Sequence, residues 1–253
     1  MSDPKFPIEW RIVGDGDAAA AAAAELFVEI AGAAIAERGA ALVALAGGST
    51  PRTAYGLLAS DAFRGRVRWD SIEFFFGDER GVPPGDPDRN DRMARDTLLS
   101  KVGIPPARIH PMPAERADRD AAADAYAGEI RAAAGAPARA TPRLDLVLLG
   151  MGADGHTASL FPGSEALGER ARLVVPARRP EGRWGMTMTY PLLNAARSVV
   201  FTATGDAKGA ALRRVVEPGA DPPPAARVRP TGRCVWIVDA PLARAAGLAA
   251  PSP

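Results

Sequence analysis

An acid and a base stand two residues apart in a glycine-rich segment, Asp154 and His156 around Gly155. A carboxylate beside an imidazole suits general acid–base catalysis, because the unperturbed pKa of histidine lies near neutrality. Gly152 and Gly155 permit positive φ and close approach of the backbone to a ligand. The apolar run before them, residues 144–149, predicts a buried parallel strand. Because open α/β sheets bind ligands at the carboxyl ends of their strands, we expect an active site here.

The glycines at 150, 152 and 155 also match the spacing of the dinucleotide fingerprint G-x-G-x-x-G. That fingerprint requires a long helix after the glycines, and Pro162 with Gly163 ends any helix within about two turns. We therefore reject a dinucleotide site, and we expect the protein to need no cofactor.

A second polar segment follows the apolar run at 41–46 and consists of Gly47, Gly48, Ser49, Thr50 and Pro51. The glycines free the backbone, and proline suits the start of a helix. Such a turn directs unpaired N–H groups and the positive end of the helix dipole at an anion. It is not a P-loop, because no Gly-Lys-Ser/Thr follows. An ordinary helix cap explains the segment equally well by itself, but a second ligand-like segment in the chain favours a phosphate monoester.

Polar residues also follow two other apolar runs. The run at 71–76 leads into Gly77-Asp78-Glu79-Arg80, and the run at 198–203 leads to Lys208. Asp78 and Arg80 fit either a solvent-exposed local ion pair or a carboxylate and guanidinium held beside a cleft. Lys208 in the first turn of a helix opposes the helix dipole, and a nearby phosphate would reverse that penalty.

The elements that must position these groups alternate along the chain. Apolar runs that predict strands are separated by segments that predict helices, such as the alanine-rich stretches 17–38 and 117–134. This alternation predicts an α/β fold with a mostly parallel sheet covered by helices on both faces. Parallel strands end at one edge, so the four polar segments can converge on one pocket. No linker interrupts the pattern, and we expect residues 1–253 to form one domain.

The net charge and the cysteine count limit which binding partners and which cellular compartment we expect. The 253 residues carry a formal net charge of +1, which gives no general attraction to nucleic acid or anionic membranes. The single cysteine, Cys234, excludes an intrachain disulfide and fits a reduced compartment. We see no apolar run of membrane-span length, no signal peptide and no zinc-binding spacing. We expect a cytoplasmic protein without a metal, either a monomer or a weak homodimer.

The longer string at 150–162, Gly-x-Gly-x-Asp-Gly-His-Thr-Ala-Ser-Leu-Phe-Pro, resembles the signature of the 6-phosphogluconolactonases, relatives of the glucosamine-6-phosphate deaminases. The resemblance extends over nearly the whole chain and includes Gly-Asp-Glu-Arg and Gly-x-x-Lys. It implies a three-layer, Rossmann-like fold and hydrolysis of 6-phospho-D-glucono-1,5-lactone to 6-phospho-D-gluconate. One position departs: family members typically carry an arginine just before Thr-x-Thr-x-Pro-x-x-Asn, where this chain has Gly185 and Met186, with Arg183 slightly upstream.

The residues and the resemblance together assign roles. His156 would act as general base toward water and as acid toward the leaving ring oxygen, supported by Asp154 or Asp78. Arg80 would either bind the phosphate or polarise the lactone carbonyl. Backbone N–H groups around Gly152–Gly155 would hold the developing oxyanion. The phosphate would be bound by Gly47, Gly48, Ser49, Thr50 and Lys208.

Two alternatives remain open at this point. A glucosamine-6-phosphate deaminase also needs a carboxylate, a histidine and a phosphate loop. Members of that family commonly continue as Ile-Ala-Phe-Asn-Glu-Pro after the histidine, whereas residues 157–162 contain no acid. A non-catalytic sugar-phosphate sensor would normally carry a basic DNA-binding module, for which this nearly neutral chain has no spare segment.

Overall fold

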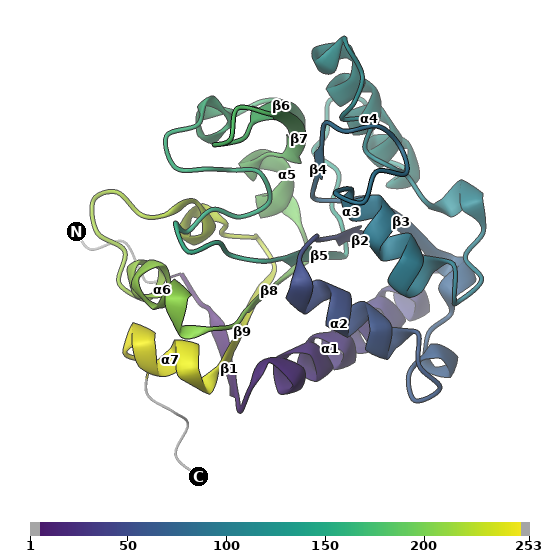
Figure 1. Ribbon diagram of the computed structural model, residues 1–253. Coiled ribbons are helices and arrows are strands. Elements are labelled where there is room, and N and C mark those ends of the chain that lie inside the picture. The colour runs from purple at the N-terminus through teal and green to yellow at the C-terminus, as the bar shows by residue number, and fades with distance from the viewer. Residues whose placement is uncertain (1–5, 249–253) are drawn as a thin grey trace.

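A computed structural model describes residues 6–248 (Figure 1). Its centre is a six-stranded sheet in the order β1-β9-β8-β5-β2-β3, and every neighbouring pair in that sheet is parallel. The strands are β1 (Glu9–Val13), β2 (Ala41–Leu45), β3 (Ile72–Phe76), β5 (Leu146–Leu149), β8 (Ser198–Ala203) and β9 (Arg233–Asp239).

Successive side chains on each strand enter two different cores, because strand residues alternate between the two faces of a sheet. Val43, Phe74 and Phe76 lie in the core beneath α1 (Gly16–Arg38), α2 (Ser49–Leu58) and α3 (Asn90–Ala94). Ala44 and Phe75 lie in the opposite core. That second core is covered by α4 (Arg119–Ala133), α5 (Tyr190–Ala195), α6 (Gly209–Val216) and α7 (Ala240–Ala246). The predicted fold class is confirmed: helices cover both faces of a parallel sheet.

Helix α1 begins and ends at residue types that commonly cap helices. The Asp15 side chain accepts a hydrogen bond from the N–H of Ala18, and Gly39 ends the helix with φ of +80°. The expectation that no apolar run reaches membrane-span length was wrong, since α1 has 23 residues and contains an 18-residue window with a mean hydropathy of 1.7. In this fold, however, its Leu26 and Phe27 are fully buried in the core beneath the sheet.

A second, antiparallel sheet was not predicted. It has three strands in the order β4-β7-β6, with β4 at Asp78–Arg80, β7 at Trp184–Met188 and β6 at Val174–Arg178. The sequence places Asp78–Arg80 in a loop after β3, but Gly77 separates these residues from β3 and they pair with β7. Because β4 is extended, Asp78 and Arg80 share one side of it and Glu79 takes the other.

Candidate active site

A cavity of about 260 Å³ opens at the carboxyl ends of β2, β5 and β8, beside β4. This is the edge at which the sequence predicted the polar segments to meet. Most of the predicted site residues line the cavity: Gly47, Gly48, Ser49, Thr50, Asp78, Arg80, Gly152, His156 and Lys208. Segments more than 150 positions apart in the chain therefore contribute to one site, as parallel strands allow.

His156 and Asp154 form a hydrogen-bonded pair. The distance between Nδ1 of His156 and Oδ1 of Asp154 is 2.6 Å, and the backbone N–H of His156 donates to the same oxygen at 3.1 Å. Burial raises the pKa of the Asp154 carboxyl, but the hydrogen bonds from His156 outweigh burial and leave the pKa below its usual value. An ionised Asp154 can only accept a hydrogen bond, so Nδ1 of His156 carries a hydrogen and donates it to Asp154. Nε2 of His156 is then the basic nitrogen.

The backbone of this loop requires glycine at two positions. A Cβ on Gly152 would lie 2.2 Å from ring atoms of His156, so any side chain there would displace the imidazole. Gly155 has φ of +84°, and a Cβ on it would lie 2.5 Å from Pro223. Ala158, which lines the cavity, also has a positive φ, +48°, an uncommon conformation for a residue with a side chain. The loop is therefore shaped around the histidine.

The expectation that the Gly152 and Gly155 amides hold an oxyanion is not supported by their hydrogen bonds. The N–H of Gly152 donates to the carbonyl of His156 at 2.9 Å, and the N–H of Gly155 donates to the carbonyl of Gly152 at 3.0 Å. Both donors are used to close the turn. Gly155 is buried and does not line the cavity. Its contribution is to the shape of the loop.

The amides of the segment at 47–51 are differently placed. Gly48 has φ of +106° and precedes the first turn of α2. Within residues 6–248, the N–H groups of Gly48, Ser49 and Thr50 donate to no other group. The first N–H groups of a helix have no intrahelical acceptor and form a binding site for anions. The side chain of Thr50 lies beside Thr204, with 3.2 Å between their hydroxyl oxygens. This geometry fits a bound phosphate.

Lys208 approaches the same cavity from the turn between β8 and α6. Burial lowers the pKa of its ammonium group, and the charge of Asp239 offsets part of that effect. A partly desolvated ammonium is strengthened as a partner for an anion, because less water competes for its protons.

Asp78 and Arg80 both line the cavity, but they differ in how many of their polar atoms have hydrogen-bond partners. Asp78 is buried and accepts hydrogen bonds from the Ser159 hydroxyl at 2.6 Å and from the Asn90 amide at 3.3 Å. The guanidinium of Arg80 donates to the carbonyl of Asp88, while its buried Nε has no partner within the described residues. Since Asp78 is bound to Ser159 and Asn90, Asp154 is the carboxylate that holds His156.

Sequence reasoning missed several residues of the cavity, among them the polar side chains of Asn90 and Arg179. Asn90 lies against the phosphate segment, because a Cβ on Gly47 would meet its side-chain oxygen at 1.9 Å. Arg179 follows β6, where the chain reads as one of several arginines in a polar stretch. The hairpin between β6 and β7 brings it to the site, and no spacing in the sequence signals that hairpin.

The second histidine, His110, is part of the structural framework. Its Nε2 lies 2.9 Å from Glu73, and its ring stacks on Phe75 with centroids 4.4 Å apart. Within residues 6–248, no cluster of three or more His, Cys, Asp or Glu side chains could hold a metal ion.

Comparisons with known proteins identify the family of this chain. Residues 14–236 match the family of glucosamine-6-phosphate isomerases/6-phosphogluconolactonase, and the chain belongs to that family. A Synechocystis protein named 6-phosphogluconolactonase is 45% identical over 81% of this chain and 85% of its own length. The solved 6-phosphogluconolactonase from Trypanosoma brucei is 30% identical, with a TM-score of 0.87 over 97% of this chain and 100% of that one. A monomeric glucosamine-6-phosphate deaminase shares the fold at 20% identity, with a TM-score of 0.78 over 95% and 100% of the two chains.

Proposed function

We propose that this protein hydrolyses 6-phospho-D-glucono-1,5-lactone to 6-phospho-D-gluconate, the second step of the oxidative pentose phosphate pathway. The observation that carries the proposal is that one cavity is lined both by His156, which is hydrogen-bonded to Asp154, and by the residues with unpaired amides at the start of α2. The first can activate water, and the second can bind the 6-phosphate. Membership of the family and the names of the relatives support this substrate.

His156 acts as the general base in the proposed reaction. Its Nε2 takes a proton from water as the water oxygen bonds to C1 of the lactone. The bond between C1 and the ring oxygen then breaks, and the imidazolium returns the proton to that oxygen. The new carboxylic acid ionises, so one proton is released for each lactone opened. Asp154 keeps the proton on Nδ1 and stabilises the imidazolium, as a carboxylate does for other catalytic histidines.

The remaining polar groups bind the substrate. The 6-phosphate is bound by the amides of Gly48, Ser49 and Thr50, by the hydroxyls of Ser49 and Thr50, and by Lys208. Arg80 adds a further positive charge to the same cavity. With no acid in residues 157–162, nothing in this site favours deaminase chemistry. We further infer a single-domain cytoplasmic enzyme, either a monomer or a weak homodimer, that works without a metal or cofactor and without nucleic-acid or membrane partners.

Proton release from freshly prepared 6-phosphogluconolactone tests the function. The enzyme should accelerate release well above spontaneous hydrolysis, and glucono-1,5-lactone without the phosphate should be accelerated far less. Equal rates with and without enzyme would contradict the proposal. Ammonia release from glucosamine 6-phosphate would then identify a deaminase, and sugar-phosphate binding without turnover would identify a sensor.

A further inference from the structure

We propose that Arg179 binds the oxygens on C1 of the substrate, first the lactone carbonyl oxygen and then the carboxylate of the product. The inference rests on the proposed function and adds a group to it. Attack of water on C1 places negative charge on the carbonyl oxygen, which a preorganised donor must stabilise. The N–H groups of Gly152 and Gly155 already donate within their own loop. Ala153 and Asp154, between them, do not line the cavity. A donor from another part of the cavity wall can take this role.

Arg179 is fixed as such a donor by its neighbours. Its Nε donates to Glu181 at 2.7 Å, and one terminal nitrogen, Nη1, donates to the hydroxyl of Ser159 at 3.1 Å. Ser159 in turn donates to Asp78 at 2.6 Å. The side chain is only 17% exposed, and it lines the cavity. Its other terminal nitrogen, Nη2, makes no hydrogen bond or ion pair within residues 6–248. A planar guanidinium held at two nitrogens keeps a third available for a ligand oxygen.

The ring of Phe161 connects this guanidinium to the proposed base. The His156 ring lies against one part of Phe161, with centroids 4.5 Å apart, and the Arg179 guanidinium carbon lies 5.3 Å from the same centroid. Phe161 is itself buried, so both groups are held on one rigid support. His156 and Arg179 therefore contact the same ring and line the same cavity, one as the proposed base and the other as the proposed donor to the carbonyl oxygen.

The strand next to β6 cannot supply this guanidinium. Gly185 stands where the family pattern has an arginine, and a Cβ on Gly185 would lie 2.5 Å from the carbonyl oxygen of Glu79. The backbone of β4 thus leaves no room for a side chain there. Gly185 pairs with Ala177 across the β6–β7 hairpin, and Arg179 follows two residues after Ala177. The arginine therefore comes from the segment that directly follows β6.

Binding of two ligands tests the proposal without turnover. 6-Phosphogluconate carries both the phosphate and the C1 carboxylate, whereas glucitol 6-phosphate carries the phosphate but only a hydroxyl at C1. In calorimetric titrations, Arg179→Met should weaken 6-phosphogluconate roughly 10- to 100-fold, the range for a lost charged hydrogen bond. It should change the affinity for glucitol 6-phosphate less than 2-fold. Lys208→Met is the matched control, because it should weaken both ligands by similar factors.

Three outcomes would overturn the assignment. Equal weakening of both ligands by Arg179→Met would make Arg179 a phosphate contact, and unchanged affinity for both would remove it from the binding site. Loss of all binding with an altered circular dichroism spectrum would show a structural role. If the role is structural, Arg179→Lys, which keeps the charge, should not restore binding of 6-phosphogluconate in preference to glucitol 6-phosphate. Wild-type enzyme that binds 6-phosphogluconate but fails to open the lactone would contradict the proposed function alone.

Discussion

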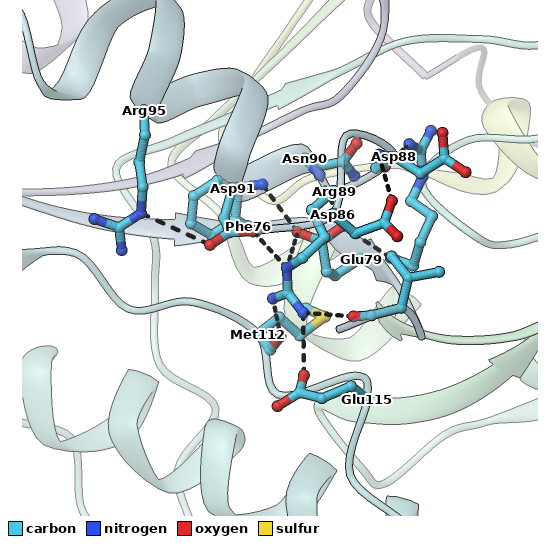
Figure 2. A network of polar contacts seen from close by, with 12 residues as sticks. Phe76, Glu79, Asp86, Asp88, Arg89, Asn90, Asp91, Arg95, Met112 and Glu115 are labelled. Carbon is cyan, nitrogen blue, oxygen red and sulfur yellow. Dashed lines mark hydrogen bonds and ion pairs between the residues drawn. The ribbon is translucent and has the colours of Figure 1, made fainter. Parts of the chain in front are cut away.

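The two sides of strand β4 hold two polar regions that differ in how completely their groups are paired. One side faces the cavity with Asp78 and Arg80. The other side carries Glu79 into a buried cluster around Arg89, which we call the Arg89 network and define as Arg89, Glu79, Asp91 and Glu115 (Figure 2). Three consecutive charged residues of the sequence thus enter two environments with opposite requirements.

The Arg89 network is closed. Arg89 is 2% exposed and donates to Asp91 at 2.6 Å, to Glu115 at 3.1 Å and to the carbonyls of Val82 and Met112 at 3.1 and 3.0 Å. Figure 2 shows these contacts converging on its guanidinium. Glu79 is fully buried and accepts the backbone N–H groups of Arg80, Asn90 and Asp91. None of the buried polar side-chain atoms of these four residues lacks a hydrogen-bond partner within the described part of the chain.

In the cavity, by contrast, several hydrogen-bond donors are unpaired. The amides at the start of α2 and the Nε of Arg80 lack acceptors within the described residues. The Nε of Arg80 is buried, and an unpaired buried donor carries a cost in free energy that a bound anion removes. The amides of Gly48 and Ser49 belong to exposed residues and are open to a ligand. The comparison teaches that the incomplete pairing of charged side chains, more than their number, distinguishes a binding site from a structural network. The network also helps to position the site, because Glu79 accepts hydrogen bonds from the backbone N–H groups of Asn90 and Arg80.

The largest expected effect separates the two regions by activity. His156→Ala should lower kcat for the lactone by roughly two to four orders of magnitude, because it removes the general base. Its urea midpoint should stay close to that of the wild type, since the imidazole lies at the cavity surface. Asp154→Asn should cause a smaller loss of kcat, because the imidazole remains but loses its orienting carboxylate. Undiminished turnover in His156→Ala would remove this residue from the mechanism.

The next effect separates the regions by stability. Arg89→Met should lower the free energy of unfolding by about 3–5 kcal/mol, because it leaves buried carboxylates without their counter-charge. The matched control is Arg92→Met, whose ion pair with Asp96 is exposed and should contribute less than about 1 kcal/mol. Urea denaturation of both variants measures the difference. Similar losses in the two would mean that burial of the network adds nothing.

A smaller effect depends on pH. Burial raises the pKa of Glu79 from 4.5 to about 7, although the N–H groups of Asn90, Asp91 and Arg80 and the charge of Arg89 act against it. The folded state therefore holds this proton more tightly than the unfolded state does. The stability that Glu79 contributes is complete below pH 4.5 and is lost as the pH rises through 7, by at most about 3 kcal/mol.

Comparison with Glu79→Gln isolates this contribution. Between pH 4.5 and 7.5, the free energy of unfolding of the wild type should fall relative to that of the variant, which cannot titrate at this position. Urea titrations at several pH values would measure the difference. A difference that is constant with pH, or that grows in favour of the wild type as pH rises, would contradict a raised pKa.

Local patterns in the sequence were enough to predict the large sheet, its helices and the edge that carries the site. Capping at Asp15 and Gly39, the apolar runs and the glycine-marked strand ends depend on residues near one another in the chain. The small sheet was missed because β4 has three residues and is stabilised by pairing with β7, about 100 positions away. Arg179 was missed for the same reason. The engagement of the Gly152 and Gly155 amides depends on hydrogen bonds that residue types do not encode.

The pairing of β1 with β9 has a consequence for synthesis on the ribosome. Strand β1 is the first to be translated, but in the sheet its neighbour is β9, more than 200 residues later. Until Asp239 has left the exit tunnel, β1 lacks that neighbour, and the apolar face of α1 lacks part of the sheet that covers it. Parallel sheets with such distant contacts fold slowly and expose apolar surface while they wait. A nascent chain of this protein should therefore expose part of the apolar face of its alanine-rich first helix until the last strand has been made.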